Sequence, residues 1–215
     1  MSEMLSELRK AILEYDVEGA TSFARKAIAE GVEPLETADV VIGAIKQVGD
    51  GYGRGELWLP DLIGAAGAMA GAMSIINEEF IRRGEKMQTL GTIVIGTVYG
   101  DIHSIGKDMV ATLAQAEGFK VIDLGLNVKG ERFIEAIREY KPQILAMSAL
   151  LTATAPEQGK VIKMIRDEGL REKVKVVVGG GAITANFAES IGADGYEPIA
   201  PMAVDLFKKI VGKGG

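Results

Sequence analysis

Apolar residues along this chain follow two different spacings, and the change falls near residue 88. Up to residue 83 they recur every three or four positions, which is the spacing of one face of an α-helix. Helices are expected at residues 2–15, 17–30, 36–52 and 60–83. Gly31 stands where the second helix should end, and Pro34 and Pro60 stand near the starts of the third and fourth. Residues 1–88 are therefore predicted to form a four-helix bundle.

After Gly91, short runs of β-branched residues alternate with longer segments of helical spacing. Strands are expected at 92–98, 120–124, 144–148, 174–178 and 194–196, and helices at 107–117, 130–140, 155–168, 184–191 and 201–211. This alternation is typical of a parallel sheet with helices on both faces. The predicted fold class is α/β: the helical bundle, then, over residues 89–215, a flavodoxin-like (Rossmann-like) five-stranded parallel sheet of order 2-1-3-4-5.

Three segments with candidate chemistry follow strands of this sheet. His103, the one histidine of the chain, comes after the first strand together with Asp101; Ser148 ends the third strand, and three glycines, 179–181, follow the fourth. In such folds ligands bind beyond the carboxyl ends of the strands, where the strand order reverses. Asp101 could accept the proton of one ring nitrogen of His103 and leave the other nitrogen free for a metal. A lone histidine is more often a solvated or core residue, so only the convergence of these segments favours a ligand.

The overall charge narrows the choice of partners. The chain has 24 Lys and Arg residues against 30 Asp and Glu residues, a net charge of −6, so nucleic acid is not an expected partner. The absence of cysteine excludes disulfides and thiolate metal sites, and a cytoplasmic location is expected. The longest uncharged run, 62–77, has 16 residues, too few to cross a bilayer, and the first residues lack the pattern of a signal peptide. No membrane segment is expected.

A phosphate-binding nucleotide site is the main rival from the same fold. The sequence Gly-Thr-Val-Tyr-Gly at 96–100 matches neither the dinucleotide fingerprint nor the phosphate-loop pattern, and the three glycines at 179–181 are a weak signal. A flavin-type electron carrier or another nucleotide-binding module would need no histidine, and it remains as an alternative.

Three motifs, in order, resemble the signature of the cobalamin-binding domain of B12-dependent methyltransferases, which is Asp-x-His-x-x-Gly, then Ser-x-Leu, then Gly-Gly. They are Asp101-Ile102-His103-Ser104-Ile105-Gly106, Ser148-Ala149-Leu150 and Gly179-Gly180. Further local matches are Leu57-Trp58-Leu59-Pro60, Val121-Ile122-Asp123-Leu124-Gly125, Leu151-Thr152 and Gly192-Ala193-Asp194-Gly195-Tyr196. Ser104 departs from the pattern, because many members of the family carry Asp there. With its helical bundle, the whole chain resembles the free-standing corrinoid proteins that serve methanol, methylamine, betaine or methoxy-aromatic methyltransferases.

The resemblance implies cobalamin or a related corrinoid as cofactor. In that family the cofactor's benzimidazole base leaves the cobalt for a protein slot, and a histidine replaces it as lower ligand. His103 maps to that histidine, and Asp101 to the partner that holds its other nitrogen; these two are the expected catalytic pair. The other expected cofactor contacts are Ser104, Ile105, Gly106, Ser148, Leu150, Thr152, Gly179, Gly180, Gly181 and Tyr196. Ser148 is expected to hydrogen-bond the buried base, with Leu150 and Thr152 lining the slot. Residues 1–88 would cap the upper face of the cofactor, with Trp58, Leu59 and Leu62 as candidates for shielding it or for ordinary packing.

The function implied by the resemblance is that of a methyl carrier. Cobalt(I) would accept a methyl group from a donor-specific methyltransferase and pass it to an acceptor methyltransferase that acts on a folate or a thiol. A reductive activation protein is a further expected partner, and the chain is not expected to turn over alone. A cobalamin-based sensor is a second alternative, although such a sensor would need an effector segment. The methyl donor, the acceptor and the oligomeric state are left open by the sequence.

Overall fold

The computed structural model describes residues 3–85 and 89–212. The chain divides between residues 88 and 89 into two compact units. Residues 86–88, which adjoin the expected domain boundary, lie outside the described residues. Each unit has its own buried core.

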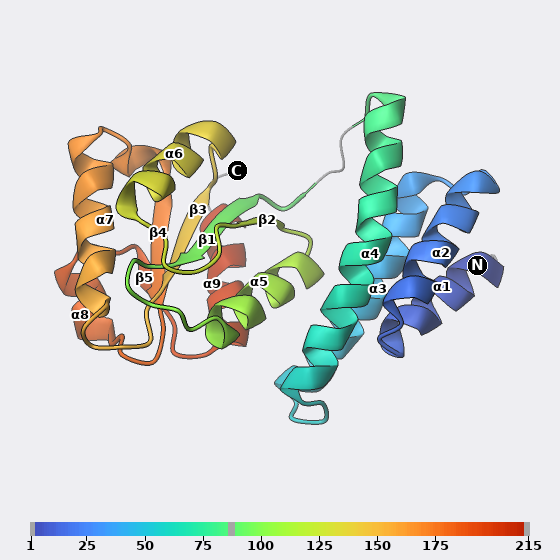
Figure 1. Cartoon of the computed structure of the whole chain (residues 1–215), viewed down its shortest axis with the longest axis horizontal. Coiled ribbons are helices and arrows are strands. Elements are labelled where there is room, and N and C mark those ends of the chain that lie inside the picture. Colours follow the sequence, from blue (N-terminus) through green and yellow to red (C-terminus); the bar gives the residue numbers. More distant parts are fainter. Residues whose placement is uncertain (1–2, 86–88, 213–215) are drawn as a thin grey trace. The chain divides into compact units, whose positions relative to one another are not determined.

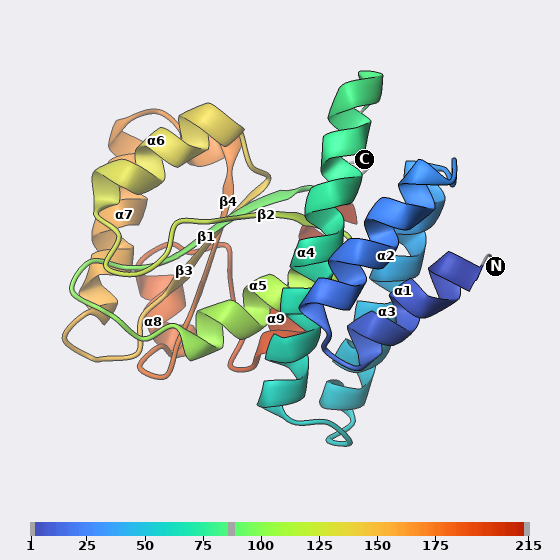
Figure 2. The same cartoon turned by 45° about the vertical axis from the view of Figure 1, so that its right-hand side comes forward.

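The first unit is built from four helices, as the apolar spacing predicts. They are α1 (Glu3–Leu13), α2 (Val17–Ala29), α3 (Pro34–Gly53) and α4 (Leu59–Arg83). They pack side by side as a bundle, with α2 on α1 and α4, and α3 on α1 and α4 (Figure 2). The Asp16 side chain starts α2 by accepting a hydrogen bond from the Gly19 amide at 2.8 Å, and Gly84, at φ 71°, ends α4.

Helix α4 carries small residues where its neighbours come closest. A Cβ atom at Gly71 would lie 2.4 Å from Thr21 Oγ1, and one at Gly64 would lie 2.9 Å from Tyr15 Cβ. Glycine at these two positions therefore allows the backbones to approach. Among the described residues, α4 is the one helix whose length and composition would allow it to cross a membrane. One side of this helix, which includes Leu62 and Ile76, is buried in the bundle core, whereas Ile63 and Ile81 are exposed.

The second unit contains one parallel sheet in the predicted order, β2-β1-β3-β4-β5 (Figure 1). Its strands are β1 (Thr92–Thr97), β2 (Lys120–Asp123), β3 (Ile144–Ser148), β4 (Lys175–Gly179) and β5 (Gly195–Tyr196). The predicted α/β fold class is confirmed. Strand β4 runs through Gly179, one residue further than predicted, because Gly179 still pairs with Ser148 of β3.

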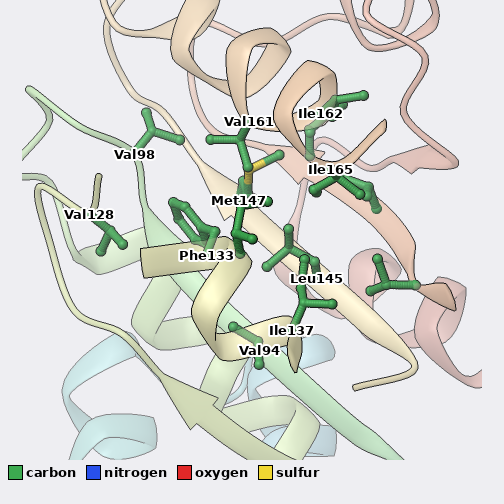
Figure 3. Close-up of a cluster of buried hydrophobic side chains, with 14 of the residues drawn as sticks. Val94, Val98, Val128, Phe133, Ile137, Leu145, Met147, Val161, Ile162 and Ile165 are labelled. Atoms are coloured by element: carbon green, nitrogen blue, oxygen red, sulfur yellow. The ribbon is translucent and has the colours of Figure 1, made fainter. Parts of the chain in front are cut away.

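Helices cover both faces of this sheet. They are α5 (Ile105–Ala116), α6 (Gly130–Tyr140), α7 (Ala155–Asp167), α8 (Ala185–Ser190) and α9 (Ala200–Gly212), with a 3-10 turn at Arg171–Lys173. Helices α5 and α9 pack together on one face, and α6 and α7 lie on the other (Figure 1). On the α6–α7 face, Phe133 and Ile162 pack against Leu145 and Met147 of β3 in a buried apolar cluster (Figure 3).

Side-chain alternation sends a different set of residues to the α5–α9 face at the carboxyl edge of the sheet. Thr97 pairs with Ser148, and Ser148 pairs with Gly179, so these three residues form one row across β1, β3 and β4. Their neighbours Met147 and Val178 belong to the α6–α7 cluster, and successive residues of a strand point to opposite faces. The row of Thr97, Ser148 and Gly179, called the edge row below, therefore faces α5 and α9.

Candidate functional site

Asp101 lies in the loop after β1 and is fully buried. Its Oδ2 accepts hydrogen bonds from Leu150 N at 2.8 Å, Leu151 N at 3.3 Å and Thr154 Oγ1 at 2.6 Å. Its Oδ1 accepts from the backbone amide of His103 at 3.1 Å. One carboxylate therefore joins the loop after β1 to the loop after β3.

The same hydrogen bonds determine the charge of Asp101. Burial raises the pKa of this carboxyl, but the donors from Thr154, His103 and Leu150 outweigh burial and hold the pKa well below its ordinary value. Asp101 is therefore ionised at neutral pH.

The imidazole of His103 is oriented by this carboxylate. Nδ1 of His103 lies 2.7 Å from Asp101 Oδ1, and the side chain is 44% exposed. Because the carboxylate only accepts hydrogen bonds, the Nδ1 atom donates, and a neutral ring then has an unprotonated Nε2. Within the described parts of the chain, Nε2 makes no hydrogen bond. Thr97 of the edge row donates from Oγ1 to the backbone oxygen of His103 at 3.1 Å, which holds the loop. His103 therefore presents a fixed, free nitrogen to solvent.

His103 can supply one ligand to a metal ion, and the described residues do not provide a full set of metal ligands around it. No group of three or more His, Cys, Asp or Glu side chains that could hold a metal ion occurs among residues 3–85 and 89–212. A bare ion needs several protein ligands, whereas a metal already held by a macrocycle needs a single axial one. The donor set therefore fits a metal that arrives within a ring, such as the cobalt of a corrinoid.

Exposed apolar residues flank His103 along the chain and occupy the neighbouring loops at the same edge of the sheet. Ile102 and Ile105 are 72% and 63% exposed, and a Cβ atom at Gly106 would meet no other atom within 4 Å. Four more exposed apolar residues lie in the loops after β1, β2 and β3: Tyr99, Leu126, Leu150 and Leu151. Apolar side chains that gather in this way usually mark a binding surface. This surface, defined by Ile102, Ile105 and these four residues, is called the apolar rim below.

Two residues of the edge row, Ser148 and Gly179, provide a hydroxyl without a partner in the described chain and an open space. Ser148 is half-buried, and its hydroxyl makes no hydrogen bond within the part of the chain that the structure describes. The nearest atom to a Cβ built at Gly179 is Glu197 O at 3.8 Å, so that position is open. Gly180 differs, because its φ of 117° favours glycine and a Cβ there would lie 2.0 Å from Ala149 O. Packing within the chain thus already requires glycine at 180.

The remaining residues expected to contact the cofactor lie in several loops and on both faces of the sheet. Ser104 directly precedes α5 and makes no side-chain capping hydrogen bond. A Cβ built at Gly181 would lie 2.8 Å from Leu150 Cδ1, so these two loops are in contact. Thr152 is exposed in the turn before α7, and it is Thr154 that reaches Asp101. Tyr196 packs against the α6–α7 cluster, so it does not join the edge row.

Sequence reasoning missed several residues that support this site. Besides Thr154, they are Lys107, Asn127 and Gln158. Lys107 is nearly fully buried, and its ammonium lies 2.6 Å from Asp108 and 2.5 Å from Asp123, so it joins the start of α5 to the end of β2.

Gln158 and Asn127 bind backbone groups elsewhere at the carboxyl edge of the sheet. Gln158 Nε2 donates to Met147 O at 3.0 Å and to Gly179 O at 3.1 Å, which ties the end of β3 to the end of β4. Asn127 Oδ1 accepts from Gly100 N at 2.7 Å. Lys107 and Gln158 are polar residues within segments of helical spacing, and this was the only feature of the sequence that could have indicated their supporting roles. No feature of the sequence indicated a role for Asn127.

Comparison with known proteins identifies the family. A family model described as a B12 binding domain matches residues 91–205, and a second model with the same description matches residues 4–77. The trimethylamine corrinoid protein of Methanosarcina barkeri is 41% identical over 207 residues, which cover 96% of this chain and 95% of that protein. Dimethylamine corrinoid protein 1 of Methanosarcina mazei is 39% identical over 213 residues, which cover 98% of each.

A solved structure agrees with these relatives. In the methanol:cobalamin methyltransferase complex of Methanosarcina barkeri, one chain matches with a TM-score of 0.88 and 29% identity over 98% of this chain and 80% of that chain. The sequence matches cover both units and favour a corrinoid over the flavin or nucleotide alternative. The chain belongs to the corrinoid proteins of B12-dependent methyltransferase systems, and its cofactor is a corrinoid.

Proposed function

We propose that this chain carries a methyl group between two methyltransferases and that His103 would coordinate the cobalt of its corrinoid. The observation that carries the proposal is the His103–Asp101 pair: Nδ1 is engaged by a buried carboxylate, while Nε2 is free at an exposed apolar edge. When bound, the corrinoid supplies the cobalt that takes up and releases the methyl group.

The residues of the chain orient the ligand and make room for the ring. Asp101 keeps the proton of the neutral imidazole on Nδ1 and makes the ring a stronger donor at Nε2. The exposed Ile102 and Ile105 of the apolar rim would contact the ring, and the open position at Gly106 would leave space for it.

The edge row would receive the cofactor's own base. Ser148, whose hydroxyl has no partner within the described chain, would hydrogen-bond that base, and the open position at Gly179 would admit it. The remaining proposed contacts are Ser104, Leu150, Thr152, Gly180 and Gly181. Tyr196 is left out of this set because it packs on the opposite face of the sheet.

The domain roles and partners follow from the same proposal. Residues 89–215 would bind the corrinoid, and residues 1–88 would form a separate helical domain. The trimethylamine and dimethylamine corrinoid proteins are about 40% identical to this chain, so we expect a methylated amine as the methyl source.

The acceptor methyltransferase would act on a folate or a thiol. A reductive activation protein would restore the reduced cobalt, and the system would work in the cytoplasm.

Electron paramagnetic resonance of the cobalt(II) form tests the ligand. We expect the reconstituted protein to show splitting from one imidazole nitrogen, and we expect His103→Ala to lose it, because no other histidine exists in the chain. His103→Gly should regain the splitting when free imidazole is added, which separates loss of the ligand from loss of the fold. Because the cofactor's own benzimidazole nitrogen would also give splitting if it returned to the cobalt, histidine labelled with ¹⁵N identifies the ligand. Splitting from ¹⁴N in the unaltered protein that carries ¹⁵N-labelled histidine would contradict the assignment.

A further inference from the structure

The loop that carries His103 is held from two sides. On one side, the buried Asp101 carboxylate binds the loop after β3 through Leu150, Leu151 and Thr154. On the other side lies the segment between β2 and α6, residues 124–129, which contributes Asn127. Asn127 is not among the residues proposed to contact the corrinoid.

Asn127 makes a reciprocal pair of hydrogen bonds with this loop. Its Oδ1 accepts from Gly100 N at 2.7 Å, and its own backbone amide donates to Asp101 O at 2.9 Å. Both partners have left-handed backbones, Gly100 at φ 81° and Asn127 at φ 52°. Asparagine is among the few non-glycine residues that adopt this conformation readily, and its short side chain can reach back to a neighbouring amide. Asn127 thus combines the required backbone shape with the required acceptor.

The segment that carries Asn127 is itself anchored to the sheet. Gly125 O accepts from Thr97 N at 3.0 Å, and Val128 N donates to Thr97 O at 2.9 Å. At its start, Asp123 accepts from Gly125 N at 2.8 Å and pairs with the buried Lys107 of α5. Because both ends are fixed, this segment can act as a support for the neighbouring loop.

We propose that Asn127 is a positioning residue for His103. Through Gly100 N and Asp101 O it holds the two peptide groups that flank the Gly100–Asp101 bond, while the Asp101 carboxylate orients the imidazole, so the backbone and the side chain of Asp101 are restrained separately. Without Oδ1 of Asn127, the Tyr99–Gly100 peptide gains freedom and the imidazole Nε2 takes a range of positions. The inference rests on the proposed role of His103 as the cobalt ligand.

The test uses substitutions that separate backbone shape from side chain. Asn127→Gly keeps the left-handed φ but removes Oδ1, and Asn127→Asp keeps an acceptor oxygen of similar reach. Lys141→Gly is the matched control: Lys141 also has a positive φ, 47°, and ends α6 as an exposed residue outside the contacts described above. Asn127→Ala is the second variant, in case glycine loosens the segment by itself.

Two measurements read out the effect on the full-length protein. In the corrinoid-free protein, we expect hydrogen exchange at the Gly100 amide, measured by nuclear magnetic resonance, to accelerate about fivefold in Asn127→Gly, as loss of one exposed hydrogen bond predicts. In the cobalt(II) form, we expect its nitrogen splitting to become weaker or heterogeneous and corrinoid affinity to fall about fivefold. Asn127→Ala should behave similarly, whereas Asn127→Asp and Lys141→Gly should match the unaltered protein.

The outcomes distinguish this inference from the function on which it rests. Absence of nitrogen splitting in the unaltered protein would overturn the ligand assignment and this inference with it. Sharp, unaltered splitting and unaltered affinity in both Asn127→Gly and Asn127→Ala would overturn the positioning role alone. An equal loss in Lys141→Gly would overturn it too, because a backbone effect would then explain the change.

Discussion

Among single side chains, Asp101 combines two roles that usually belong to different residues. Its Oδ2 binds the loop after β3 through Thr154, Leu150 and Leu151, and its Oδ1 orients His103. Hydrogen bonds to a charged acceptor are about twice as strong as neutral ones, so a buried carboxylate suits both tasks. Substitutions can separate the two roles.

Asp101→Asn should retain the corrinoid but change the cobalt. The amide has a single acceptor oxygen and adds an N–H donor, so it cannot serve all the donors that meet at Asp101, and the imidazole becomes a weaker ligand. We expect the cobalt(II)/cobalt(I) midpoint potential to rise and methyl transfer to slow by about 10- to 100-fold. Spectroelectrochemical titration and single-turnover kinetics measure these two quantities.

Thr154→Val provides the comparison for Asp101→Asn. It removes the 2.6 Å hydrogen bond to Oδ2 but leaves the contact between Oδ1 and His103. Its midpoint potential should move less than that of Asp101→Asn. An Asp101→Asn protein with the potential and rates of the unaltered chain would show that Asp101 only shapes the loop.

Among the helices, the end of α4 is joined to the start of α3 by an ion network. Glu79, which is 8% exposed, receives hydrogen bonds from Arg82 and Arg83, and Arg83 also pairs with Glu33 at 2.8 Å. The hydrogen bonds from Arg82 and Arg83 lower the pKa of Glu79 to about 2. The network therefore stabilises the bundle only while Glu79 is ionised.

Glu79→Gln should lower the stability of the bundle in a pH-dependent way. The folded-state pKa lies below the unfolded value, so the stabilisation is present above about pH 4.5 and is lost as the pH falls towards 2. We expect the variant to unfold at lower denaturant than the unaltered protein at pH 7, with the difference shrinking towards pH 3. Far-UV circular dichroism during the denaturant titration, which follows the loss of helix, measures the midpoints.

Glu56→Gln is the matched control for Glu79→Gln. Glu56 pairs with Arg54, but both side chains are largely exposed, and exposed pairs contribute little to stability. Its denaturation midpoint should stay near that of the unaltered protein at every pH. A Glu79→Gln midpoint equal to that of Glu56→Gln at pH 7 would contradict a stabilising network.

At the scale of the whole molecule, the charged side chains described beside His103 are already engaged by other residues of the chain. Asp101 is committed to His103 and the loop after β3, and the nearby Lys107 is committed to Asp108 and Asp123. None of these groups is free to act as a general acid or base. We therefore expect partner enzymes to activate the methyl donor and acceptor.

The purified protein with its corrinoid should therefore show negligible turnover with methylamines or methanol. We expect turnover only when a donor-specific methyltransferase and an acceptor methyltransferase are added, measured as product formed per corrinoid. His103→Ala in the complete mixture is the control for corrinoid-dependent transfer. Multiple turnovers by the unaltered chain alone would mean that it contains a catalytic group of its own.

Local pattern was enough to predict the architecture and the centre of the site. The change from helical spacing to short β-branched runs predicted the four helices and the five parallel strands, because periodicity reflects which side of each element is buried. The order of the strands was taken from the fold class that this alternation indicates, and the structure has that order, which places the loops after β1 and β3 at the switch point. Asp101 and His103 could be paired in advance because they are two residues apart, so one loop brings them together.

The supports of that pair depended on the tertiary structure. Thr154 and Asn127 are 53 and 27 residues away from the groups they bind, and only the folded loops decide that Thr154, not Thr152, reaches Asp101. Tyr196 was expected near the cofactor, but its register beside Val178 turns it to the α6–α7 face. The sequence by itself determined the elements and the contact between Asp101 and His103, since both follow from local spacing. Strand register and loop packing decided which distant side chains complete the site, since hydrogen bonds require contact in space.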